Sequence, residues 1–127
     1  PIGSRGLGDV YKRQAQQAAR DLFAKQDQPD AVFVANDHMA FAAMDVVRFE
    51  LGLHIPEDVS FVGYDDVALA AWPSYDLTTV RQPANRMVTE TVQMLLARID
   101  NPDAEPRRVS IDGPLIIRGS AKQPEGA

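Results

Sequence analysis

The chain has 127 residues, of which 45% are hydrophobic and 24% are charged, so it is long enough for one hydrophobic core and too short for two ordinary domains. Thirteen Lys and Arg residues against 18 Asp and Glu give a formal net charge of -5, and an acidic surface repels nucleic-acid phosphates. The absence of cysteine excludes disulfide frameworks, thiol nucleophiles and cysteine-based metal sites.

The sequence also carries no membrane or export signal. No apolar run approaches the roughly 18 residues that a spanning helix needs. The N-terminus lacks the basic, apolar and small-residue order of a secretory signal. We therefore expect a cytoplasmic protein without a membrane partner.

Residues 1–14 (PIGSRGLGDVYKRQ) show neither helical nor strand periodicity. Within them, residues 4–14 resemble the conceptual translation of a transposase adapter used in DNA library preparation. We interpret residues 1–14 as an adapter-derived segment foreign to the domain, which then comprises residues 15–127. The alternative is a flexible natural N-terminus.

From Ala15 onward, helical and strand patterns alternate. Apolar residues at helical spacing predict a helix over 15–25, and the run AVFVA predicts a strand over 31–35 that is buried on both faces. Asn36 and Asp37 then offer N-cap chemistry for a helix over about 38–51, with Gly52 as its stop.

The second half continues the alternation. The patterns SFVGY (60–64) and LTTVRQ (77–82) predict two strands, and Pro83 precedes a helical pattern whose Met and Leu stripe is typical of a core-facing helix. Two short strands are predicted over 107–112 and 114–119. The expected fold is therefore α/β: a layered, largely parallel sheet flanked by helices.

Four segments carry a family resemblance: PDAVFVANDHMAFAAM, GLHIPEDVSFVGYDDVALA, LTTVRQP and PLIIRGS. In this order and spacing, residues 15–127 resemble the LacI/GalR family of bacterial transcription repressors. The resemblance implies the C-terminal subdomain of a periplasmic-binding-protein-like type I domain that binds a sugar-like effector. It also implies DNA binding only through an N-terminal headpiece that this sequence does not contain.

Three polar residues are candidates for ligand binding. Asn36 and Asp65 directly follow two predicted strands, at the carboxyl ends where open α/β sheets bind ligands. A carboxylate and an amide together suit a polyhydroxylated ligand. The resemblance implies effector contacts for both, and for Gln82 a position near the pocket. The alternatives are a helix cap for Asn36, an Asx-turn for Asp65 and a solvated side chain for Gln82.

Other polar residues are expected to be structural. Asp37 and Asp66 are best interpreted as cap or turn residues, and neither His38 nor His54 has a partner at catalytic or metal-ligand spacing. Glu57 and Asp58 lie at the opposite end of a predicted strand from Asp65 and Asp66, too far apart to share an ion. No metal site and no cofactor are therefore predicted.

The resemblance further implies a homodimer. Phe41 and Val46 fall off the main apolar stripe of their helix, and Trp72 is a large aromatic residue in a polar loop. We expect Phe41 and Trp72 at or near the dimer contact, although core packing is an equally good interpretation of Trp72.

The function expected is effector sensing by a transcriptional regulator. The alternative is the solute-binding subunit of a sugar ABC transporter, which shares the fold and the cleft. An enzyme is not expected, because no Gly-x-Ser-x-Gly motif, P-loop or cysteine nucleophile is present.

Overall fold

A computed structural model describes the backbone of residues 2–126 and the side chains of residues 8–126. Its sheet has the order β1-β2-β3-β4, built from β1 (Ala31–Phe33), β2 (Ser60–Asp65), β3 (Thr78–Arg81) and β4 (Leu115–Ile116). The first three strands are parallel and β4 is antiparallel to β3. The predicted α/β fold with a largely parallel sheet is confirmed.

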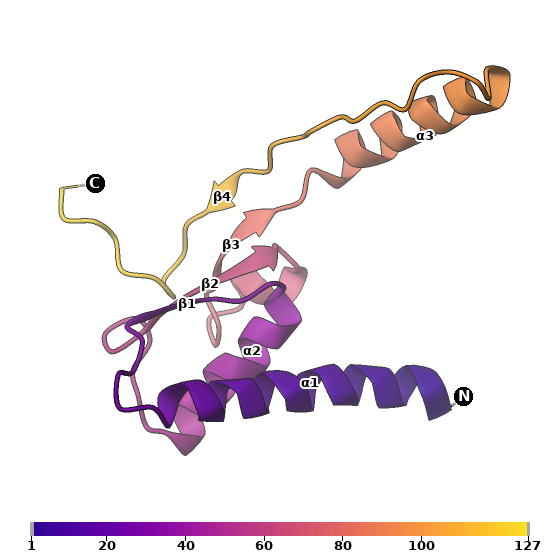
Figure 1. Cartoon of the computed structure of the whole chain (residues 1–127). Coiled ribbons are helices and arrows are strands. Elements are labelled where there is room, and N and C mark those ends of the chain that lie inside the picture. Colours follow the sequence, from indigo (N-terminus) through magenta and orange to yellow (C-terminus); the bar gives the residue numbers. More distant parts are fainter. Residues whose placement is uncertain (1, 127) are drawn as a thin grey trace.

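Two helices cover the sheet on the side that faces downward in Figure 1, namely α1 (Ile2–Phe23) and α2 (Asp37–Asp45). A π-helical turn (Val46–Glu50) continues α2, and Gly52 follows at a φ of 67°, a left-handed conformation that ends the helix. The stop predicted at Gly52 is thus confirmed. A 3₁₀ turn (Ala68–Ala71) lies between β2 and β3.

Helix α1 begins at Ile2 and not at Ala15, so the start predicted for this helix is wrong and residues 2–14 are helical although they lack helical periodicity. Good helix formers such as Lys12, Arg13 and Gln14 let a helix extend without an apolar face. The side chains of residues 8–14 are all exposed, whereas Ala15 and Phe23 are buried. A foreign origin of residues 1–14 remains a prediction, and residue 1 lies outside the described part.

The core forms where α1, α2 and the middle of the sheet meet. Its largest fully buried apolar side chains come from α2 and its continuation, from the segment entering β2, and from β2 itself and the residue before β3. They are Phe61, Met44, Leu77, Val46, Val47 and Val59. Helix α2 and its continuation thus contribute Met44, Val46 and Val47 to this set.

Phe41 and Val46 are buried, which contradicts the expectation that they lie exposed on α2. Phe41 is only 4% exposed and Val46 only 1%. The Phe41 ring lies 4.3 Å from the ring of Tyr75, measured between centroids, on the side of α2 away from its predicted stripe. Because α2 packs against α1, β2 and the Tyr75 loop together, it is buried around most of its circumference.

The burial predicted for both faces of β1 is wrong. Phe33 is 65% exposed, and Ala31 is also exposed. β1 lies at the edge of the sheet, with β2 as its only neighbour among the described strands. An edge strand leaves one side of its backbone unpaired, and here it also leaves an aromatic side chain uncovered.

Helix α3 (Ala84–Asp100) forms as predicted but does not pack into the core. None of its residues is buried, and its large apolar side chains are exposed: Met87, Val88, Val92, Leu95, Leu96 and Ile99. Figure 1 shows α3 extending away from the rest of the domain, joined to it through β3 and β4. Residues 107–112, predicted as a strand, have no regular structure. Within residues 2–126, no helix is both long and apolar enough to cross a lipid bilayer.

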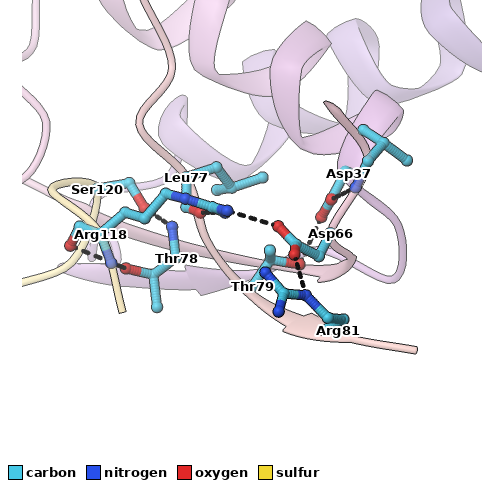
Figure 2. A network of polar contacts seen from close by, with 9 residues as sticks. Asp37, Asp66, Leu77, Thr78, Thr79, Arg81, Arg118 and Ser120 are labelled. Carbon is cyan, nitrogen blue, oxygen red and sulfur yellow. Dashed lines mark hydrogen bonds and ion pairs between the residues drawn. The ribbon is translucent and has the colours of Figure 1, made fainter. Parts of the chain in front are cut away.

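An ion-pair network fastens the strands that lead to and from α3 (Figure 2). The carboxylate of Asp66 accepts hydrogen bonds from Arg81 Nε at 2.6 Å and from Arg118 at 2.7 Å. Ser120 Oγ accepts from the Thr78 amide at 2.8 Å and donates to the Phe61 carbonyl at 2.6 Å. These bonds attach the C-terminal segment to β2 and β3.

The Phe41 position provides a test of the observed core. Phe41→Ala should lower the free energy of unfolding by about 3–5 kcal/mol, because a buried ring is lost and a cavity is left. Urea denaturation followed by circular dichroism measures this change. Val88→Ala on α3 is the control and should cost less than about 1 kcal/mol, since Val88 is 62% exposed. Equal losses for both variants would show that Phe41 is not in the core.

The Asp66 network predicts a pH dependence. Partial burial raises the pKa of Asp66, but the hydrogen bonds and charges of Arg81 and Arg118 outweigh it and hold that pKa below its ordinary value. A lowered carboxylate pKa contributes stability that is present above about pH 4 and is lost as the pH falls through the folded-state value.

Asp66→Asn should therefore destabilise the chain by about 2 kcal/mol at pH 7, and the difference from the unsubstituted chain should shrink below pH 4. Thermal unfolding at a series of pH values measures both effects. A difference that stays constant from pH 7 to pH 2 would contradict the ion-pair assignment.

Candidate ligand-binding site

The parallel pairing of β1 and β2 brings Asn36 and Asp65 to the same edge of the sheet. Phe33 pairs with Val62, and the Val34 amide donates to the Val62 carbonyl at 2.8 Å. Continuing this register by three residues sets Asn36 opposite Asp65. Both residues stand at the carboxyl ends of their strands, as the sequence predicts.

Asn36 and Asp65 open into one cleft of about 650 Å³. Its walls come from α1, from α2 and from the segments that follow β2. The lining residues are Gly8, Tyr11, Lys12, Asn36, His38, Met39, Phe41, Ala42, Asp45, Asp65, Leu69 and Tyr75. The predicted geometry of these two residues is thus confirmed, whereas ligand binding by them remains a prediction.

Asn36 is both a cap and a cleft residue. Its Oδ1 accepts a hydrogen bond from the Met39 amide at 2.9 Å, which satisfies one of the free N–H groups at the start of α2. The capping alternative is therefore correct for the oxygen. The side-chain NH₂ group has no acceptor among the described residues, and it faces a cleft in which a ligand hydroxyl could accept its hydrogen bond.

Asp65 projects from a strained turn. Asp65 and Asp66 have φ angles of 134° and 59°, in the region that non-glycine residues seldom occupy. Such backbone persists only where surrounding contacts enforce it, and it is frequent at functional sites.

Gln82 contacts Asp65 and does not itself line the cleft. Its Nε2 donates to Asp65 Oδ1, and its backbone amide lies 3.4 Å from the Asp65 carbonyl. The structure thus brings the three predicted residues together, with Gln82 orienting the carboxylate. One oxygen of Asp65 remains without a bond from the described chain and can accept from a ligand.

Sequence reasoning missed Asp45 and Tyr75. The Tyr75 hydroxyl donates to Asp45 Oδ2 at 3.2 Å inside the cleft. Burial, and then the neighbouring Asp45 carboxylate, raise the pKa of Tyr75 above its ordinary value. No local signal links the two residues, because α2 and the loop after the 3₁₀ turn supply one each. His38, which the sequence left out of the site, also lines the cleft.

Asp37 is not a simple cap or turn residue, and its interpretation as one is incomplete. It does begin α2, but its side chain is fully buried and accepts hydrogen bonds from the Val67 amide and from Thr79. The signal that could have revealed this is Gly63, the glycine inside an otherwise apolar strand, since such a glycine often marks the close approach of another group.

The cleft offers both directed hydrogen bonds and apolar surface to a ligand. A carboxylate and an amide offer directed hydrogen bonds, while Phe41, Leu69 and Tyr75 supply apolar surface. Across residues 2–126, no group of three or more His, Asp or Glu side chains is arranged to hold a metal ion. Asp58 lies just before β2, at the end opposite Asp65, as the sequence predicts.

The two residues assigned to a dimer contact differ in exposure. Trp72 is 59% exposed, just after the 3₁₀ turn. Phe41 is buried within the chain, so the argument that placed it on a dimer surface is wrong. Only Trp72 is available to meet a partner without rearrangement of the core.

Comparison with known proteins agrees with this fold. A family model described as a periplasmic binding protein-like domain matches residues 4–121. The HTH-type transcriptional repressor PurR of Photobacterium profundum is 35% identical over 115 residues, which cover 91% of this chain and 34% of that protein.

Two solved structures resemble the chain closely, and both contain a sugar. The transcriptional regulator CelR in complex with cellobiose is 36% identical, with a TM-score of 0.78 over 87% of this chain and 33% of that chain. A LacI family transcriptional regulator from Enterococcus faecalis V583 with bound ribose is 33% identical, with a TM-score of 0.73 over 87% of this chain and 40% of that chain.

This chain spans about a third of the length of the PurR and CelR relatives. The family model nevertheless covers residues 4–121, nearly all of the chain, and the relative of known structure shares its fold. The chain therefore belongs to the periplasmic binding protein-like domain family, in the form that LacI/GalR-family regulators carry.

Proposed function

We propose that the chain is the effector-sensing part of a LacI/GalR-type transcriptional regulator and that its effector is a sugar or sugar derivative. The observation that carries the proposal is the cleft at the carboxyl edge of the sheet, into which Asn36 and Asp65 open and where Gln82 holds Asp65. Relatives that bind cellobiose and ribose support a sugar as the ligand.

A regulator is favoured over the transporter subunit because the relatives named above are repressors or regulators. The same names favour binding over catalysis. In this proposal the protein works in the cytoplasm and reaches DNA through a separate headpiece, since this chain is acidic, with a net charge of -5. The effector acts by shifting the population of two conformations that differ in DNA affinity.

The cleft has only part of its wall in this chain. A sugar site encloses most of its ligand. The relatives are about three times as long as this segment, so in this proposal the rest of the regulator supplies the remaining wall. The isolated chain should therefore bind sugar weakly. Gly8, Tyr11 and Lys12 line one side of the cleft, and they belong to the stretch interpreted as foreign. The proposal therefore includes that other residues form this side of the cleft in the native regulator.

Asp65 is the first residue to test. In the full-length regulator that contains this chain, Asp65→Asn should weaken binding of its sugar by about tenfold to a hundredfold, the effect of losing a charged hydrogen bond. Calorimetric titration with ribose, cellobiose and a panel of other mono- and disaccharides measures the change.

The matched control is Asp58→Asn, which removes the same charge at the far end of β2. Asp58 has 47% of its side chain exposed and should leave the affinity within about twofold. Binding of no sugar by the unsubstituted regulator, or equal affinities for the regulator and Asp65→Asn, would overturn the assignment of the cleft.

A second candidate property is self-association through the Trp72 loop. We propose a two-fold symmetric dimer of the full-length regulator, because an exposed Trp in a loop is typical of protein interfaces. Trp72→Asp should convert the dimer to monomers in sedimentation velocity. Phe49→Asp, at an aromatic residue that is 81% exposed in the turn after α2, is the control and should leave the dimer intact. Monomeric sedimentation of the unsubstituted regulator would rule the interface out.

A further inference from the structure

We infer that Asp37 is a positioning residue for the cleft: its buried carboxylate holds the turn from Asp65 to Val67 in the conformation that presents Asp65 to the ligand. The inference deepens the proposed function and rests on it in one respect, because Asp65 is the residue proposed to contact the sugar. The geometry of the turn is independent of any ligand.

The Asp37 carboxylate joins three parts of the fold. Its Oδ2 accepts a hydrogen bond from the Val67 amide at 3.0 Å, and its Oδ1 accepts one from Thr79 Oγ1 at 2.6 Å. Asp37 and Thr79 are both fully buried. Figure 2 shows the Asp37 side chain reaching from the start of α2 toward Thr79 on β3. Because water cannot reach these bonds, it does not compete for their donors.

Strand β2 is shaped to admit this carboxylate. A Cβ atom at Gly63 would lie 2.4 Å from Asp37 Oδ1, far inside van der Waals contact, so only glycine allows the carboxylate to lie against the strand. The same atom would lie 2.9 Å from Leu77 Cδ2 in the core. Gly63 and Asp37 therefore form a matched pair, and the pair stands two residues before the turn at Asp65.

The turn needs an external restraint because two consecutive non-glycine residues in it have positive φ. Val67, the next residue, returns to an extended conformation with a φ of -68°. The bond from the Val67 amide to Asp37 thus fixes the chain at the point where the strained segment ends. On the other side, Gln82 holds the Asp65 carbonyl and carboxylate.

Asp37 also links the two residues proposed to bind the ligand, Asn36 and Asp65. It directly follows Asn36, the cap of α2, and it binds the amide two residues after Asp65. One carboxylate therefore sets the separation between the amide and the carboxylate that face the ligand.

Amide hydrogen exchange on the 127-residue chain tests the restraint directly. Asp37→Ala should raise the exchange rate of the Val67 amide at least about tenfold, because that amide loses its acceptor. Asp37→Asn keeps one acceptor oxygen and should restore most of the protection. Val59→Ala, a buried truncation just before β2, is the stability control and should leave the Val67 amide close to its original rate.

A double-mutant cycle on the full-length regulator tests the link to the ligand, with ribose and cellobiose as probes. Asp37→Ala should weaken sugar binding about tenfold when Asp65 is present and by less than about twofold in the Asp65→Asn background, because Asp37 acts through Asp65. Val59→Ala should leave the affinity unchanged in both backgrounds. If Asp37→Ala fails to fold, Thr79→Val replaces it, since that variant removes one donor to Asp37 and keeps the shape of the side chain.

The outcomes separate this inference from the proposed function. Exchange at Val67 that does not respond to Asp37→Ala or Thr79→Val would overturn the positioning role. Additive losses of affinity in the cycle, or equal losses in Val59→Ala, would also overturn it, because they indicate a general effect on stability. Faster exchange at Val67, together with sugar binding that Asp65→Asn does not change, would refute the sugar site and leave the restraint on the turn established.

Discussion

The fold depends on how closely the start of α2 approaches the middle of the sheet. Asp37 can bury its carboxylate there because Gly63 leaves room for it and because Val67 and Thr79 donate to it. This contact joins a helix, a strand and a turn that are distant in the sequence. A buried carboxylate without these donors would cost several kcal/mol, so the three elements must arrive together. The orientation of α2 against β2 and β3, and with it the floor of the cleft, follows from this requirement.

Local sequence patterns predicted most of the elements but not their surroundings. The alternation of apolar runs with helical stripes indicated the strands at 60–65 and 78–81, the helix after Pro83 and the cap at Asn36, because each signal lies within a few residues. A stripe shows that one face of a helix is apolar, and it does not show what covers that face. For this reason the Met and Leu stripe of α3 was assigned to a core that the described chain does not provide.

The same limit applies to single side chains. Phe41 lies off the apolar stripe, and its burial depends on Tyr75, which belongs to a distant loop. The cleft was predictable through Asn36 and Asp65, since parallel strands end at one edge. The Asp45–Tyr75 pair and the buried role of Asp37 were not, because each needs a tertiary contact that no spacing in the sequence encodes. Only the glycine within β2 hinted at such a contact.

The turn from Asp65 to Val67 is also connected to α3, the helix that extends away from the rest of the domain. Asp65 faces the cleft, and the next residue, Asp66, binds Arg81 at the end of β3 and Arg118 just after β4. Those two strands are the links through which α3 is joined to the domain (Figure 1). In the proposed function, a ligand bound to the Asp65 carboxylate would therefore contact a turn whose other hydrogen bonds fix the direction of both links. The backbone of this turn is strained, so it persists only because the contacts of Asp37, Gln82 and the two arginines enforce it. In the proposed regulator, an effector bound at Asp65 would bias the direction of α3 only to the extent that it binds two conformations of this turn unequally.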